Sequence, residues 1–134
     1  NLLKNRKKIE KIISKFKKKK IRTCLFIDPN FEDIKIAKKL NADCVELHTG
    51  RISDLVKNKK NFSGEYKKIK KCCELTKKIG IEVHAGHGLD YETAAILTKI
   101  KEITEFNIGH FIIGESITHG LKKTVKEFRK IFNR

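Results

Sequence analysis

The spacing of apolar residues along the chain switches repeatedly between the period of helices and that of strands. The spacing of one helical face occurs in five stretches: Arg6–Lys19, Phe31–Leu40, Glu65–Ile79, Asp90–Lys101 and Leu121–Phe132. Shorter strand-like runs lie at Arg22–Asp28, Cys44–His48 and Ile81–Gly86, and a fourth begins near Phe106. This order predicts a helix followed by four βα units.

Two segments leave the pattern open. Arg51–Gly64 is polar and irregular, and only one helical turn is expected there, around Ile52–Val56. This is long for a βα loop, and long loops in compact domains are often functional. After Phe106, either one strand continues to Gly114, or the strand ends at Gly109 and a short helix begins at His110.

Strands separated by helices imply a parallel sheet with right-handed crossovers. Four such units fit either half of an eight-stranded barrel or a small doubly wound sheet. In a doubly wound sheet helices cover both faces, so the strands are apolar throughout. Here one strand face is apolar, whereas the other carries polar residues: Arg22, Asp28, Glu46, His48, Glu82 and His84. The alternation favours an α/β fold of the TIM (β/α)8 type, with a polar interior near its mouth.

The chain is strongly basic, with 32 Lys and Arg residues against 16 Asp and Glu and a net charge of +16. A basic surface can attract nucleic acid. However, lysine supplies most of the charge, and the lysines fall mainly on the polar faces of predicted helices. Trp is absent and Tyr occurs only twice, so rings for base stacking are scarce. A solvated lysine-rich surface is therefore favoured over a nucleic-acid interface.

The remaining composition bears on location and completeness. No run approaches the about 20 apolar residues of a membrane span, so membrane association is not expected. The four cysteines contain no CxxC pair, which predicts a reducing, cytoplasmic compartment without disulfides or cysteine-bound metal. The chain begins at Asn1 rather than Met, inside a helical pattern. An upstream piece is therefore expected.

Active sites of barrels form at the carboxyl ends of the strands, where this chain has Asp28, Glu46, His48, His87 and His110. Glu46 is predicted to point inward. It would either stabilise charge developing on a substrate or form an internal salt bridge with Arg22 or a lysine. His48 would orient Glu46 or contact substrate, and His84 and His119 are assigned to structure.

Two glycine-containing turns carry the most specific signal. Ala85–Leu89 reads AGHGL, and the backbone N–H of Gly88 could approach a phosphate oxygen closely; the alternative is a tight turn with an incidental histidine. Asn107–His110 reads NIGH. Barrel phosphate sites commonly use the loops after strands seven and eight and an extra helix. If these are those strands, Gly88, Gly109 and His110 form that site, which favours a helix from His110.

A metal site is the weaker alternative. The set Glu46, His48, His84 and His87 offers ligand types that suit zinc. Its spacing matches no known ligand motif, so no metal is predicted.

Four blocks, LFID (Leu25–Asp28), VELHTG (Val45–Gly50), AGHGL and NIGHFIIGESI (Asn107–Ile117), resemble pyridoxine 5′-phosphate synthase in order and spacing. The resemblance runs from about Arg6 to the last helix. It implies a TIM barrel with additional helices and assembly into a homo-octamer. It also implies condensation of 1-deoxy-D-xylulose 5-phosphate with 3-amino-2-oxopropyl phosphate to form the pyridine ring of vitamin B6, without metal or organic cofactor.

The resemblance also implies roles for single residues. His87 matches the proton donor and Glu46 the residue that stabilises the charged transition state. Gly88, Gly109 and His110 match the ligands of the amino-ketone phosphate. A histidine suits the repeated proton transfers of such a condensation, because its ordinary pKa lies near neutrality.

The chain departs from this family in lacking the first four strands, which supply a general-base histidine, a carboxylate partner and phosphate-binding arginines. Residues 1–134 are therefore expected to be the C-terminal half of one barrel domain, inactive alone. The alternatives are another phosphate-binding barrel, an isomerase or aldolase using His87 as its acid, or a basic nucleic-acid-binding domain.

Overall fold

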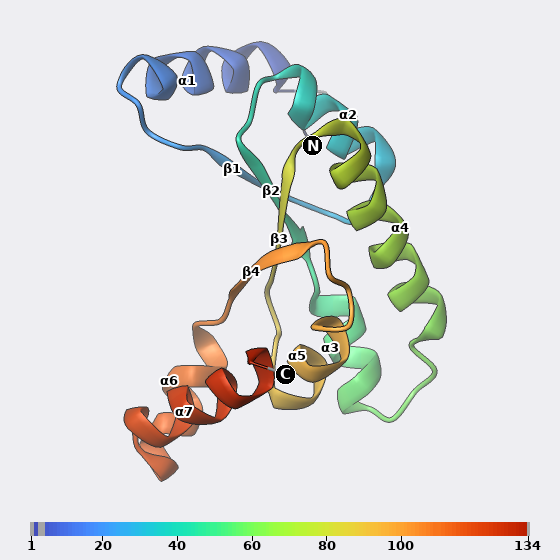
Figure 1. Ribbon diagram of the computed structural model, residues 1–134, viewed down its shortest axis with the longest axis vertical. Helices are drawn as coiled ribbons and strands as arrows, with labels where there is room; N and C mark the ends of the chain where they lie inside the picture. Colours follow the sequence, from blue (N-terminus) through green and yellow to red (C-terminus); the bar gives the residue numbers. More distant parts are fainter. Residues whose placement is uncertain (1, 3–4, 134) are drawn as a thin grey trace.

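The computed structural model describes residues 2 and 5–133. The strands are β1 (Cys24–Ile27), β2 (Cys44–His48), β3 (Glu82–Gly86) and β4 (Ile103–Asn107). The helices are α1 (Arg6–Lys18), α2 (Phe31–Lys39), α3 (Gly50–Lys57), α4 (Ser63–Ile79), α5 (Tyr91–Leu97), α6 (His110–His119) and α7 (Leu121–Phe132). Helices thus precede and separate the strands in the predicted order (Figure 1).

The four strands form one parallel sheet in the order β1-β2-β3-β4. The predicted α/β class is confirmed. A doubly wound sheet reverses its strand order at a switch point, whereas the described strands follow one another in chain order. The arrangement is consistent with part of a TIM-barrel-like fold.

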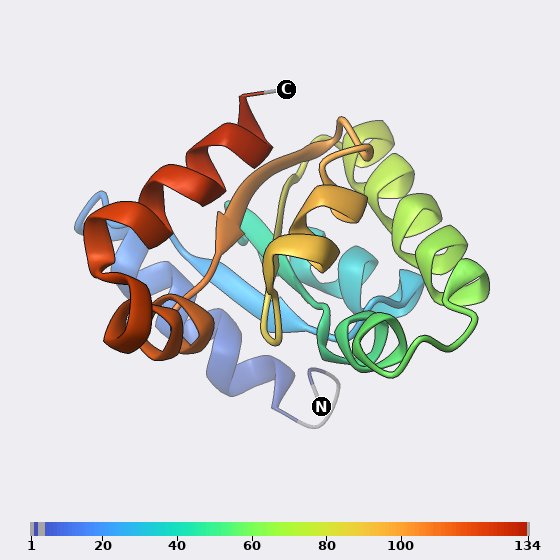
Figure 2. The same ribbon diagram turned by 90° about the horizontal axis from the view of Figure 1, so that it is seen from below.

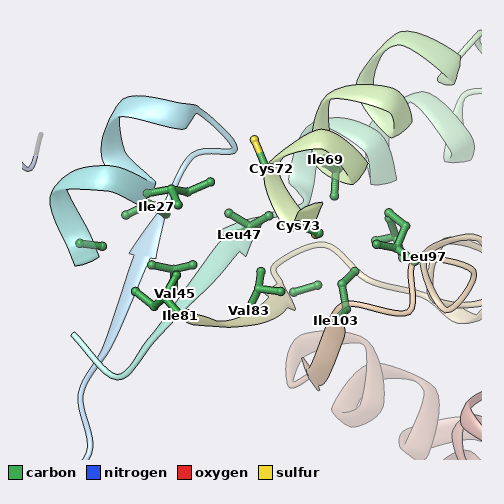
Figure 3. Packing of buried hydrophobic residues seen from close by; sticks show 14 of the residues in the cluster. Ile27, Val45, Leu47, Ile69, Cys72, Cys73, Ile81, Val83, Leu97 and Ile103 are labelled. Atoms are coloured by element: carbon green, nitrogen blue, oxygen red, sulfur yellow. The ribbon is translucent and has the colours of Figure 1, made fainter. Parts of the chain in front are cut away.

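The core lies between one face of the sheet and the helices α2 and α4. Val45 and Leu47 of β2 are fully buried, as is Ile69 of α4. Figure 3 shows these side chains together with Val83 of β3 and Cys73 of α4. Burying each such aliphatic side chain stabilises the fold by about 1.5–3 kcal/mol. The predicted apolar face of the strands is confirmed.

The opposite face of the sheet carries the polar residues, as predicted. Phe26, Glu46, His84 and Glu105 are successive register partners across the four strands. Phe26 is 53% exposed on this face, while α2 and α4 lie together on the other side of the sheet (Figure 2).

Local sequence signals account for several element ends. Asn30 caps α2 by accepting a hydrogen bond from the backbone N–H of Asp33 at 2.8 Å. Gly80 ends α4 with a φ of 67°, the left-handed conformation that favours glycine. Asp90 caps α5 by accepting from the N–H of Thr93 at 2.8 Å. The predicted roles of Gly80 and Asp90 are confirmed.

Three sequence expectations need correction. Strand β4 begins at Ile103 rather than near Phe106, because Ile103 is a core residue that pairs with Val83. The segment after Gly50 is the helix α3 rather than an irregular loop with one turn. Helix α5 ends at Leu97, before the predicted Lys101, because the chain turns back there to enter β4. The other element ends agree with the predictions within about two residues.

The alternative of one long strand from Phe106 to Gly114 is wrong, since α6 begins at His110. Among the helices of the described residues, none has the length and apolar character required to cross a bilayer.

Candidate functional site

A pocket of about 710 Å³ opens at the carboxyl ends of β2, β3 and β4. Its lining includes all five residues assigned to the site from sequence: Glu46, His87, Gly88, Gly109 and His110. They come from three neighbouring strands and the turns that follow them. The two glycine-containing turns therefore meet at one cavity. Asp28, which also ends a strand, is not part of its lining.

Glu46 lies on the polar face of β2, is half-buried and lines the pocket. Asn107 Nδ2 donates a hydrogen bond to Glu46 Oε2 at 2.9 Å. The alternative salt bridge with Arg22 is not formed, because Arg22 pairs with Glu82 at 2.6 Å. Glu46 thus has an amide donor as its described partner and keeps its other carboxylate oxygen available to a ligand.

Gly86 makes room for the Glu46 side chain. A Cβ added at Gly86 would lie 2.8 Å from the Glu46 carboxyl carbon and nearer still to one of its oxygens. Such a contact is shorter than van der Waals distance. The Glu46 carboxylate therefore occupies space that the Cβ of any other residue at position 86 would fill.

His87 stands on the turn after β3 with a φ of 78°, in the left-handed region that non-glycine residues rarely adopt. That conformation costs of order 1 kcal/mol. Thr49 holds the turn in place. Its hydroxyl lies 2.8 Å from the carbonyl oxygens of both Gly86 and His87, and its N–H donates to Gly86 O at 2.8 Å. The His87 side chain itself is exposed to the pocket.

His48 packs against His87. The two rings are stacked, with centroids 4.4 Å apart and planes at 26°. The ring of Phe26 lies beside both, with its centroid 5.3 Å from that of His48 and 6.4 Å from that of His87. A Cβ at Gly50 would meet both rings, at 2.7 Å from His48 Cε1 and 2.9 Å from His87 Cδ2. Among the described residues, the ring of His48 thus packs against His87 and Phe26.

The amino terminus of α6 borders the pocket through Gly109, His110 and Phe111. The first N–H groups of a helix lack partners within the helix and lie at the positive end of its dipole. No side chain caps α6 at Gly109, in contrast with α5, where Asp90 fills this role. The uncapped end of α6 is therefore suited to an anionic ligand.

Gly88 completes the same wall. Its φ is 76°, and a Cβ there would lie 3.2 Å from Gly50 Cα and 3.2 Å from Ser53 Cβ. The turn after β3 thus packs closely on the start of α3. Around Gly109, in contrast, a Cβ would meet no atom within 4 Å, so that residue borders open pocket space.

Among the residues not assigned to the site from sequence are Thr49, which holds the turn after β3, and Lys57 and Asn107, which line the pocket. Lys57 brings a cation to the pocket from the end of α3. The i, i+4 spacing of Ile52 and Val56, both buried in this helix, was the sequence signal that could have predicted α3 and so the position of Lys57. Nothing in the sequence pattern indicates the contacts of Thr49 and Asn107, because both partners are distant along the chain.

The alternative metal set Glu46, His48, His84 and His87 is not brought together. Within the described part of the chain, the three-residue grouping of potential ligands is Cys24, Cys44 and His84. His84 is buried and forms a hydrogen bond to Glu82 at 2.9 Å. His119 pairs with Glu115 at 3.1 Å, on α6.

A parallel sheet in chain order, with a pocket at the carboxyl ends of its strands beside an uncapped helix terminus, defines an α/β protein with a candidate binding site at that edge of the sheet. The family model described as pyridoxal phosphate biosynthesis protein PdxJ matches residues 1–134. The chain belongs to this family.

Curated relatives agree with the family match. A pyridoxine 5′-phosphate synthase from Pelagibacter ubique is 72% identical over all 134 residues of the chain, which cover 56% of that protein's length. A protein of the same name from Zymomonas mobilis is 41% identical over 93% of the chain and 48% of its own length. One from Anaplasma phagocytophilum is 39% identical over 90% of the chain and 49% of its own length. The chain thus spans about half the length of the curated relatives it matches.

Proposed function

We propose that residues 1–134 are the C-terminal half of a TIM barrel and supply half of the active site of a pyridoxine 5′-phosphate synthase. The reaction joins 1-deoxy-D-xylulose 5-phosphate to 3-amino-2-oxopropyl phosphate, without a metal or organic cofactor in the chemistry. The observation that carries the proposal is the meeting of Glu46, His87 and the two glycine turns at one pocket. The family match favours this activity over an isomerase, an aldolase or a nucleic-acid-binding domain.

The phosphate of the amino ketone is held by Gly88, Gly109 and His110. The support for this is the uncapped amino terminus of α6 and the open space beside Gly109. Backbone N–H groups at a helix terminus bind phosphate without the conformational entropy cost of ordering long side chains. Lys57 at the pocket wall adds a complementary charge.

His87 donates protons during the condensation and dehydration steps. Its imidazole is exposed in the pocket and supported on one side by His48. A positioned general acid of this kind contributes about 10²–10⁴-fold to rate. Glu46 stabilises the positive charge that develops on the reacting nitrogen, and Asn107 fixes the direction of its carboxylate.

The remaining half of the barrel would supply the general base, its carboxylate partner and the second phosphate clamp. By themselves the 134 residues therefore bind phosphate but do not turn over substrate. We further propose the homo-octameric assembly of the family and a cytoplasmic location. Four free cysteines suit such a reducing compartment.

The test is a chimera that joins this chain to the part of the Pelagibacter ubique relative it does not match. Its product is pyridoxine 5′-phosphate, measured from the two phosphorylated substrates. We expect turnover by the chimera and none by the 134 residues alone. His87→Asn should lower kcat by about 10²–10⁴-fold, and Glu46→Gln should lower it by about 10²–10³-fold.

His119→Asn is the matched control, because His119 pairs with Glu115 outside the pocket lining. It should leave kcat unchanged. A folded chimera without activity, or one whose kcat is unaffected by His87→Asn, would contradict the proposed function. Turnover by the 134 residues alone would contradict the half-site.

A further inference from the structure

A second cluster of chemically reactive side chains lies on the polar face of the sheet, outside the pocket lining. Cys24 and Cys44 are the first residues of β1 and β2 and are direct register partners. His84 of β3 lies beside them. One ligand atom from each residue, two sulfurs and a ring nitrogen, lies within 4.8 Å of the others. The proposed reaction uses none of these three groups.

The spacing of these atoms fits a tetrahedral ion. Cys24 Sγ lies 3.9 Å from His84 Nδ1. In tetrahedral zinc sites with Zn–S bonds of about 2.3 Å and Zn–N bonds of about 2.0–2.1 Å, sulfur and nitrogen ligands stand about 3.6 Å apart. Closing the difference requires a shift of only a few tenths of an ångström, which rotation of the Cys24 side chain would supply.

His84 is oriented as a metal ligand would be. Its Nε2 forms a hydrogen bond with Glu82 Oε1 at 2.9 Å, and its side chain is 6% exposed. Arg22 Nη2 holds the other carboxylate oxygen of Glu82 at 2.6 Å. A carboxylate on one ring nitrogen keeps the proton there and leaves the lone pair of the other nitrogen free to bind metal. The free nitrogen, Nδ1, is the one that faces the cysteines.

A fourth donor lies near His84 but outside the group of three mutually close ligand atoms, so its side chain must rotate to reach the ion. Glu105, the register partner of His84 on β4, places Oε1 3.5 Å from His84 Nδ1. Its side chain is 54% exposed, and Cys24 is exposed as well, on the sheet face that the proposed barrel encloses. Two thiolates neutralise a divalent cation, which limits the cost of holding the charge against the sheet. The donor set of two sulfurs, one imidazole and one carboxylate suits Zn²⁺.

We propose that Cys24, Cys44 and His84 bind a structural Zn²⁺ ion, with Glu105 as fourth ligand and Glu82 as the group that orients His84. The ion ties the first residues of β1 and β2 to the middle of β3 and β4. It therefore stabilises the sheet, and it takes no part in the proposed condensation.

The experiment titrates the full chain with Co²⁺, a spectroscopic substitute for zinc, and then displaces it with Zn²⁺. We expect one equivalent of Co²⁺ to give thiolate-to-cobalt charge transfer in the near ultraviolet and intense tetrahedral d–d bands. Cys24→Ala, Cys44→Ala and His84→Asn should each abolish this spectrum. Cys72→Ala is the matched control, because Cys72 is buried on α4 and is not one of the clustered ligands, and it should leave the spectrum unchanged.

Glu82→Gln tests the orienting role and keeps all four ligands. It should weaken Zn²⁺ binding by about 10–100-fold, as measured by competition with a chelator. Circular dichroism of each metal-free variant checks the fold, and Cys24→Ala decides the matter if His84→Asn does not fold, because Cys24 is exposed. A cobalt spectrum without thiolate charge transfer, or one that survives Cys24→Ala, would overturn the proposal.

Discussion

Replacing Gly86 with alanine should damage the site while leaving the fold intact. The added Cβ would lie 2.8 Å from the carboxyl carbon of Glu46, where van der Waals contact requires about 3.5–4.0 Å. Gly86 is not among the residues with positive φ, so alanine adopts its backbone without strain. The closest atoms belong to the free end of the flexible Glu46 side chain, whose carboxylate will move by about 1 Å. The added Cβ would also lie 3.3 Å from Asn107 Cβ, which must yield by a few tenths of an ångström.

The expected costs follow from these contacts. Displacing Glu46 breaks its hydrogen bond with Asn107, worth about 1 kcal/mol at an exposed site. Alanine recovers about 0.4–1 kcal/mol by restricting the unfolded chain, so the free energy of unfolding should change by less than about 1 kcal/mol. A displacement of about 1 Å in a catalytic group can lower kcat about 100-fold, which corresponds to about 2.7 kcal/mol.

The assay is kcat of the chimera with Gly86→Ala, Glu46→Asp and both changes. The shorter aspartate relieves the contact with the new Cβ, so the two effects should not add, and the double variant should be no slower than Gly86→Ala alone. Gly114→Ala is the control, since a Cβ there meets no atom within 4 Å. Strict additivity, or full activity of a folded Gly86→Ala chimera, would refute this account of how Glu46 is positioned.

Three further predictions concern other parts of the chain. Thr49→Val removes the hydroxyl between the Gly86 and His87 carbonyls and should lower the free energy of unfolding by about 1–3 kcal/mol in urea titrations; Thr76→Val, where the lost partner is a helical carbonyl, should cost less. Gly109→Ala should leave the thermal midpoint unchanged, because its Cβ meets no protein atom, yet weaken inorganic phosphate binding about tenfold in calorimetry by intruding on the proposed anion site; equal binding would contradict that site. The hydrogen bond from the Thr23 N–H lowers the pKa of Asp43, so the carboxylate stabilises the fold above its unfolded pKa of about 3.9 and loses this contribution as pH falls through the lowered folded value. Asp43→Asn should therefore be less stable than the parent at pH 7, by about 1 kcal/mol, with a difference that shrinks in acid; a constant difference would contradict the assignment.

The sequence pattern predicted what depends on periodicity and on local backbone chemistry. Burial of alternate residues in β2 and β3, such as Val45 and Val83, followed from the two-residue period. Gly80 and Asp90 followed from the backbone needs of helix ends. The meeting of Gly88 and Gly109 at one pocket followed from the rule that parallel strands present their carboxyl ends at the same edge.

Periodicity could not reveal contacts between residues remote along the chain. The pairing of Arg22 with Glu82, rather than with Glu46, depends on which inner-face residues are adjacent in the folded sheet. The cluster of Cys24, Cys44 and His84 was not predicted from sequence for the same reason, since ligand motifs are recognised by spacing along one element and these residues lie on three strands. The length of helix α3 was underestimated as one turn around Ile52–Val56, because eight residues give a short periodic signal.

The partner of Glu46 depends on an irregularity that no alternation pattern contains. Val83 pairs with Ile103, but His84 pairs with Glu105, so Thr104 is an extra residue in β4. Without this bulge, Gly86 would pair with Phe106, and Asn107 would point to the helix-covered face, because a one-residue shift reverses every side chain of a strand. The bulge instead pairs Gly86 with Asn107, which places the amide across the glycine from Glu46. A single inserted residue near the start of β4 thus sets the direction of the carboxylate in the pocket.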